Sequence, residues 1–163
     1  MRALTGLLPW AVVLVLVGAT VWALYERNLV AGRWLLAGLL LAHGLVHALY
    51  LVPQPAMSAA GPQWPFDLAR AWPVQAAWLD PGLARAIATA VITAVVAGFA
   101  LTGLSTLGLG VPSAWWPALV SASAALSMLL LVLCFDPQLL AGVAIDLVLL
   151  WLALVASWRP ALA

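Results

Sequence analysis

The sequence contains no lysine, a single cysteine and very little charge of either sign. Only 7% of its 163 residues are charged, whereas about a quarter of the residues in an ordinary soluble domain are charged. A chain with so few ionisable groups cannot cover a folded core with a water-facing surface, so its surplus apolar side chains must face lipid. The composition excludes an ordinary soluble domain and predicts an all-α transmembrane helical bundle in the lipid bilayer.

The same scarcities exclude several kinds of partner and site. With a net charge of +1 and no basic stripe, the chain is not expected to bind nucleic acid. Because Cys134 is the only cysteine, an intrachain disulfide and a cysteine-based zinc or iron–sulfur site are both excluded.

Five apolar segments are long enough to cross the hydrocarbon core, which needs about 20 residues. We expect a single membrane domain over residues 1–163. Asp80-Pro81 and Asp136-Pro137 mark two helix starts, because aspartate caps free N–H groups and proline fits the first helical turn. Residues 102–110, rich in glycine, are expected to form a flexible turn. The expected spans are approximately 4–25, 33–52, 81–104, 113–134 and 137–158.

Residues 53–80 form the one long connection between spans, and they are rich in proline and tryptophan. We expect one or two short helices over residues 66–80, lying in the membrane interface that tryptophan favours. These helices either anchor the loop or cover a pocket between the spans. The arginine counts on the two sides are equal, so the positive-inside rule gives no orientation. Long loops of this composition more often face outward, so we expect a multi-pass cell-membrane protein with an extracytoplasmic loop.

Three ionisable residues lie deep inside predicted spans, where charge is costly and calls for a partner or a purpose. They are His43, His47 and Asp146. The two histidines are four residues apart and therefore share a helix face. At about 1.5 Å per residue, His43 and Asp146 each lie roughly 13 Å from the loop-side end of their spans. The two side chains are therefore expected at the same depth.

Further polar residues share this half of the membrane. Thr89 and Ser127 lie about 10 to 12 Å inside their spans, and Arg85 lies nearer the surface. We predict a polar ligand-binding pocket in the leaflet next to the long loop, and an almost purely apolar opposite leaflet. The predicted ligand-binding residues are His43, His47, Asp146, Thr89, Ser127 and Arg85, and the loop adds Asp67, Arg70 and Trp72 as candidates.

Four uses of this pocket stay open. His43, His47 and Asp146 have the ligand count of a zinc or non-haem iron site, which makes them metal candidates. A haem is a second use, although its axial histidines normally come from facing helices. A third is proton relay from a His–Asp pair to a bound quinone headgroup. In the fourth, the polar side chains only fix the register of the helices.

Several short segments together resemble small bacterial integral membrane proteins of unassigned function. They are His43-Gly-Leu-Val-His47, Phe66-Asp67 with Arg70 and Trp72, Phe135-Asp136-Pro137, and Ala144-Ile145-Asp146-Leu147. The resemblance implies no activity and no particular cofactor.

Three functions therefore stay open. The first is a redox or small enzymatic protein that binds a metal, a quinone or a lipid-like ligand. The second is an accessory or scaffolding subunit that packs against other membrane subunits or further copies of itself. The third is a transporter or channel subunit, although no inverted repeat or pair of broken helices is visible.

Overall fold

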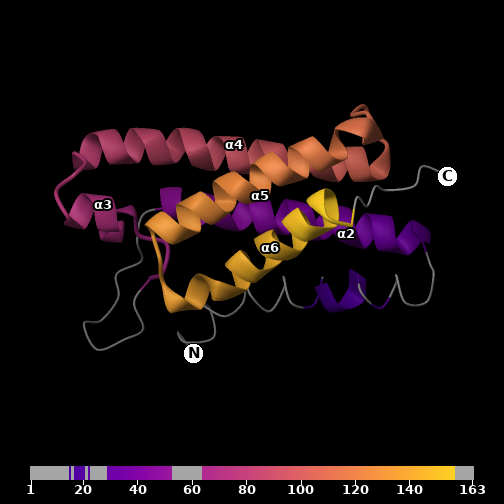
Figure 1. Cartoon of the computed structure of the whole chain (residues 1–163), viewed down its shortest axis with the longest axis horizontal. Helices are drawn as coiled ribbons and strands as arrows, with labels where there is room; N and C mark the ends of the chain where they lie inside the picture. The colour runs from indigo at the N-terminus through magenta and orange to yellow at the C-terminus, as the bar shows by residue number, and fades with distance from the viewer. Residues whose placement is uncertain (1–14, 16, 21, 23–28, 53–63, 157–163) are drawn as a thin grey trace.

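The computed structural model describes residues 15, 17–20, 22, 29–52 and 64–156. Over these residues the chain is helical and contains no strand, which confirms the predicted all-α bundle (Figure 1). Four of the described helical segments are long and apolar enough to cross a membrane, as a multi-pass membrane protein requires. The expected span at 4–25 lies outside the described residues, apart from 15, 17–20 and 22. The four segments are Val30–Leu51, Pro81–Leu107, Ser113–Leu133 and Pro137–Leu154.

The spanning segments combine α-helices with short 3-10 turns. α4 (Pro81–Leu107) is the longest helix and packs against both α2 (Leu29–Val46) and α5 (Trp116–Leu133), while α5 packs against α6 (Leu140–Leu154). All four run along the long axis of the molecule in Figure 1. The 3-10 turns are η1 (His47–Leu51) after α2, η3 (Ser113–Trp115) before α5 and η4 (Pro137–Leu139) before α6.

Both predicted helix starts are confirmed by their caps. Asp80 Oδ1 accepts hydrogen bonds from the backbone N–H groups of Gly82 and Leu83 at 2.9 and 3.0 Å. Asp136 Oδ1 accepts one from the N–H of Gln138 at 2.9 Å. Each carboxylate thereby satisfies N–H groups that have no partner inside the helix.

The prediction of a flexible turn over residues 102–110 is wrong for most of this segment. α4 continues through Leu107 and ends only at Gly108, whose φ of 73° is the left-handed conformation that glycine adopts freely. The threonine hydroxyls do not break the helix, because Thr102 and Thr106 donate to the carbonyls of Gly98 and Thr102 four residues back.

The prediction of an almost purely apolar opposite leaflet is also wrong. Thr102, Ser105 and Thr106 lie near the end of α4 that is remote from the long loop, and all three are fully buried. Trp116 Nε1 donates to Thr106 Oγ1 at 2.9 Å, and Arg33 Nε donates to the Thr106 carbonyl at 3.0 Å. Thr102 and Thr106 donate to carbonyls of their own helix, and Ser105 donates to the Pro112 carbonyl. Because these hydroxyl groups are not ionisable, a search for buried charge in the sequence does not find them.

Short helices in the 66–80 region are confirmed. They are η2 (Leu68–Arg70) and α3 (Trp72–Gln75). Asp67 caps η2 by accepting from the N–H of Ala69 at 2.9 Å, and Arg70 Nη1 lies 3.5 Å from Asp136 Oδ2. The second contact ties this loop to the connection between α5 and α6.

Small residues let the spanning helices approach closely. A Cβ atom added at Gly44 of α2 would lie 2.9 Å from the Cβ of Phe99 on α4. One added at Gly98 of α4 would collide with the hydroxyl of Ser123 on α5. Such close approach is the usual source of packing energy between helices in a bilayer, where tails are as apolar as the side chains.

Candidate functional site

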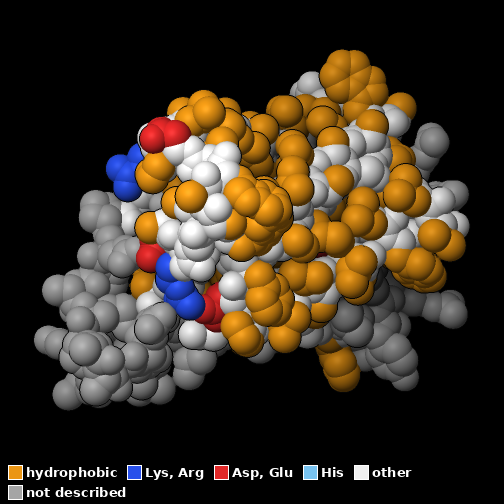
Figure 2. Space-filling model, turned by 60° about the vertical axis from the view of Figure 1, so that its left-hand side comes forward, with side chains coloured by type: hydrophobic (Ala, Val, Ile, Leu, Met, Phe, Trp, Pro, Cys, Tyr) orange, Lys and Arg blue, Asp and Glu red, His pale blue; other side chains and the backbone are white. Residues whose placement is uncertain are grey.

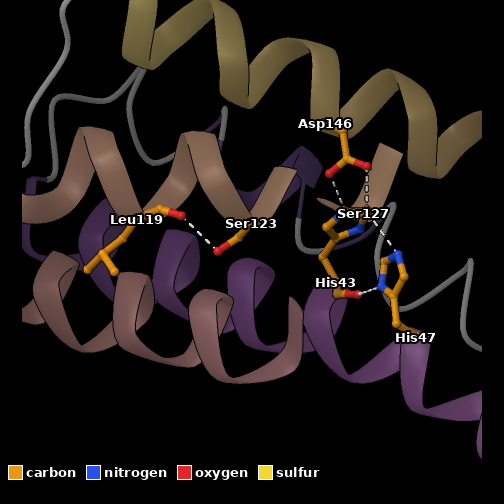
Figure 3. Close-up of polar contacts among 6 residues, drawn as sticks. All are labelled: His43, His47, Leu119, Ser123, Ser127 and Asp146. Atoms are coloured by element: carbon orange, nitrogen blue, oxygen red, sulfur yellow. Dashed lines mark hydrogen bonds and ion pairs between the residues drawn. The ribbon is translucent and has the colours of Figure 1, made fainter. Parts of the chain in front are cut away.

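The structure brings His43 and Asp146 into direct contact inside the bundle. His43 lies in the last turn of α2 and Asp146 near the middle of α6. His43 Nε2 is 2.8 Å from Asp146 Oδ1, and the two side chains are 3% and 0% exposed. The equal depths that the sequence indicates therefore correspond to a real pair (Figure 3).

Ser127 of α5 connects this pair to the second histidine. Its Oγ lies 2.5 Å from Asp146 Oδ2 and 2.9 Å from His47 Nε2. His47 is the first residue of η1, and it is almost completely buried. Figure 3 shows the serine hydroxyl between the carboxylate and the His47 ring, so one hydroxyl bridges three helical segments.

The last contact closes the network on itself. His47 Nδ1 is 3.0 Å from the carbonyl oxygen of His43. A carbonyl oxygen only accepts hydrogen bonds, so Nδ1 must carry the hydrogen and donate it. We call the four residues His43, His47, Ser127 and Asp146 the polar network.

The two histidine rings of the polar network contact each other, and an aromatic ring of α4 packs against them. The His43 ring lies edge to face against the His47 ring at 5.4 Å between centroids, and against Phe99 at 5.0 Å. Phe99 is fully buried. In such an apolar setting each polar group needs a partner, because an unmade hydrogen bond costs roughly 1–3 kcal/mol.

Counting donors and acceptors gives one arrangement of hydrogens that satisfies every contact and places opposite charges on two of the side chains. His47 carries hydrogen on both ring nitrogens, and its Nε2–H donates to Ser127. The serine hydroxyl donates to Asp146 Oδ2, and His43 Nε2–H donates to Oδ1. Every contact is then satisfied, with Asp146 as a carboxylate and His47 as an imidazolium.

A second arrangement with the same number of protons is equally complete and has no charges. Asp146 carries a proton on Oδ2 and donates it to Ser127, while the serine hydroxyl donates to an unprotonated His47 Nε2. The His43 and His47 Nδ1 bonds are unchanged. The two arrangements differ by the transfer of one proton from Asp146 to His47 through a hydroxyl that both gives and accepts.

Two of the predicted ligand-binding residues, Thr89 and Arg85, are exposed on α4, so the structure does not bring them into the polar network. Thr89 donates its hydroxyl to the carbonyl of Arg85 at 2.8 Å, within its own helix. The buried face of α4 carries Ala88, Ile92 and Val95. Depth along a helix follows from counting residues, but the direction of a side chain follows from helix rotation, which places Thr89 and Arg85 outside.

The three loop candidates belong to the framework at the loop end. Asp67 caps η2, and Arg70 pairs with Asp136. Trp72 packs edge to face on Trp78, with ring centroids 5.2 Å apart. These contacts shape the loop, whereas the polar network is built from η1 and the spanning helices.

The polar network does not have the arrangement of a metal site. In the part of the chain that the structure describes, no group of three or more His, Cys, Asp or Glu side chains is placed to hold a metal ion. Instead, His43 Nε2 and both nitrogens of His47 are engaged in hydrogen bonds with protein atoms. The histidines also come from one helical segment and touch each other, which differs from the facing pair that usually holds a haem.

Two buried donors near the loop end escaped the reasoning from sequence. Tyr50 Oη and Trp64 Nε1 have no hydrogen-bond partner in the described structure. Both rings pack edge to face on Phe66, at 5.2 and 5.5 Å between centroids. No sequence pattern marks these two donors, because tyrosine and tryptophan are common near the ends of membrane spans.

Comparison of the chain with protein-family models, with curated proteins and with solved structures finds no match. The resemblance to small bacterial membrane proteins therefore stays a prediction.

Proposed function

We propose that this chain is an integral membrane protein whose polar network moves a proton to or from a bound quinone in a redox or small enzymatic role. The observation that carries the proposal is the unbroken chain of short contacts from Asp146 through Ser127 to His47, which permits two complete arrangements of hydrogens. Two arrangements of equal proton count supply a route for transfer without an unpaired intermediate.

The transfer is balanced within the network. Asp146 gives its Oδ2 proton to Ser127 Oγ while Ser127 gives its own proton to His47 Nε2. The O–H bond of the carboxyl group breaks, an N–H bond forms, and a carboxylate and an imidazolium result. After this step His47 holds one proton more than in the uncharged arrangement, and Asp146 holds one fewer. This is general acid–base chemistry, which transfers a proton to or from a carbonyl or hydroxyl oxygen.

A quinone is favoured because it dissolves in the bilayer, and because its oxygens take up protons when an external electron donor reduces it and release them when the quinol is oxidised. The two unpartnered donors, Tyr50 Oη and Trp64 Nε1, support a ligand that accepts hydrogen bonds. Tyr50 follows His47 by three residues along η1. A quinone oxygen held at this end of the bundle would lie beyond His47, whose Nδ1–H would have to leave the His43 carbonyl to pass a proton to it.

Asp146→Asn is the decisive variant, because it imitates only one of the two arrangements. An amide donates from Nδ2 to Ser127 and accepts from His43, so the hydrogen bonds of the uncharged arrangement survive. The proton of an amide is not transferable. We expect Asp146→Asn to fold and to lose all exchange of protons with an added short-chain quinone.

The measurement is infrared difference spectroscopy on the protein in lipid nanodiscs, with the quinone present in its oxidised form and after chemical reduction to the quinol. The wild type should show a carboxyl band that shifts in heavy water, and Asp146→Asn should lack it. Thr89→Val is the matched control, because it removes an exposed hydroxyl of similar depth. A wild-type carboxyl band that reduction of the quinone leaves unchanged would contradict the proposal.

A second candidate is an accessory subunit in which the polar network is purely structural. It is favoured by the way the network joins α2, α5 and α6 while its donors and acceptors satisfy one another. In that case Asp146→Asn would retain both stability and function. Copurification of the wild type and this variant with the same partners in fixed proportion would support the accessory role.

A further inference from the structure

An apolar cavity near the loop end shares none of its lining residues with the polar network. Its volume is about 110 Å³, and it lies between α4, α5 and the short helices that cover them. The Cys134 thiol is the most polar side-chain group in a wall that is otherwise hydrocarbon. An apolar cavity of roughly 150 Å³ in another protein stays dry and takes apolar guests, so a guest of this kind fits here.

The cavity is partly open towards the surface that lipid covers. Its wall includes Ile87 of α4 and Leu129 of α5, which are 47% and 49% exposed. Both belong to spanning segments, at Pro81–Leu107 and Ser113–Leu133. Exposed side chains of a spanning helix face hydrocarbon, so the neighbour of this opening in the membrane is an acyl chain.

The loop covers the other side of the cavity. Ala71, Pro73 and Val74 contribute to the wall from in and around α3. Figure 2 shows hydrophobic side chains over much of this face, with the few charged groups gathered towards one edge. A cavity roofed by an interfacial loop and open towards the bilayer has the shape to hold the upper part of one lipid chain.

An exposed arginine lies next to the cavity wall, about 6 Å along the helix axis from the start of a spanning helix. Arg85 lies in the first turns of α4, between the wall residues Ala84 and Ala88. It is exposed, and no ion pair involves it in the described structure. Asp80 already caps the free N–H groups of Gly82 and Leu83, so the guanidinium is the attractive group for an anion.

We infer that this cavity binds one acyl chain of an anionic phospholipid, with Arg85 paired to the phosphate group. Chain binding is driven by van der Waals contact that fills a void, since the chain is surrounded by hydrocarbon both before and after binding. The charge supplies selectivity. One arginine near the surface favours an anionic over a neutral lipid by about fivefold.

The test uses phosphatidylglycerol with a photoreactive group on its acyl chain, in nanodiscs that contain the full-length protein. After irradiation, mass spectrometry of the peptides locates the adducts. We expect adducts to concentrate on cavity residues such as Leu129 and Leu133. The inference would be overturned if all lipid-facing surfaces were labelled to the same extent. It would also be overturned if these residues were found crosslinked to a second copy of the protein.

Two variants separate the tail from the headgroup. Ala88→Leu fills the cavity and should reduce the adducts there by about tenfold, whereas Ala90→Leu adds the same bulk at an exposed position and should not. Arg85→Gln should leave labelling by a neutral photoreactive phosphatidylcholine unchanged and remove the preference for phosphatidylglycerol. Equal labelling in Ala88→Leu and Ala90→Leu would contradict the tail site, and an unchanged lipid preference in Arg85→Gln would contradict the headgroup pairing.

Discussion

Ser127 Oγ lies 2.5 Å from Asp146 Oδ2, although the two residues are 19 positions apart and belong to successive helices. The same oxygen is 2.9 Å from His47 Nε2, on a third segment of the chain. A single hydroxyl therefore links an acid and a base inside the bundle. The predictions that follow concern this link, the packing that makes it fit and the caps that support it.

Replacement of Asp146 by alanine should destabilise the bundle much more than replacement by asparagine. Alanine leaves His43 and Ser127 without their shared partner, and a buried donor without a partner costs roughly 1–3 kcal/mol. Asparagine keeps both bonds and should cost less than about 1 kcal/mol. Unfolding in mixed detergent micelles measures both. Equal losses would show that the charge, and not the hydrogen bonds, matters for stability.

Nitrogen NMR should report the position of the relayed proton directly. The chain has only two histidines, so their ring signals are readily assigned. In the wild type the His47 Nε2 signal should show a fraction of imidazolium, because Ser127 links this nitrogen to Asp146. In Asp146→Asn the same nitrogen should become a pure acceptor. Identical His47 signals in the two proteins would contradict proton sharing.

Gly98→Ala should force α4 away from α5. The added Cβ collides with the Ser123 hydroxyl, and overpacking of this kind costs roughly 1–3 kcal/mol. The double variant Gly98→Ala with Ser123→Ala should recover part of the loss, since the colliding oxygen is gone. Gly18→Ala is the control, because nothing lies within 4 Å of a Cβ at that position. Equal thermal stability of Gly98→Ala and Gly18→Ala would refute the close contact.

Cys134 should react slowly with polar alkylating reagents below pH 9. Burial, with a smaller effect of the charge on Asp67, raises the pKa of this thiol from 9.0 to about 11. The thiolate is the reactive form, so at pH 8 the folded chain should label about a hundredfold more slowly than the unfolded chain. Stability should fall as pH rises from 9 to 11, because the folded state resists the ionisation that the unfolded state accepts. Labelling at equal rates in folded and unfolded protein would contradict this.

Asp136→Ala should destabilise the α5–α6 connection more than Arg70→Ala. The carboxylate caps η4 through the N–H of Gln138, and loss of such a cap costs about 1 kcal/mol. The ion pair with Arg70 is 3.5 Å long and its arginine side chain is 40% exposed. Solvent screening reduces such a pair to a few tenths of a kcal/mol or less, roughly. Denaturant unfolding of both variants and the wild type measures the two losses of stability. A larger loss in Arg70→Ala than in Asp136→Ala would contradict this ranking.

Part of the candidate site could be predicted from the sequence, because the depth of a residue in a membrane helix follows from the number of residues between it and the helix end. His43 and Asp146 are equally far from the loop-side ends of their spans, and they are in contact. Thr89 also had the right depth, yet it is exposed. Counting gives position along an axis, whereas contact also requires the right rotation about it.

The sequence by itself determined that this chain forms apolar helices and where several of them begin. Because the chain has so few charged residues, its surface must face lipid. Asp80 and Asp136 cap N–H groups within two or three residues, so these helix starts do not depend on the rest of the fold. Only the tertiary structure decided which side chains face inward, because helix rotation is set by close contacts such as that of Gly44 with Phe99. Those contacts bring Ser127 between a carboxyl group and an imidazole, and no local pattern specifies that arrangement.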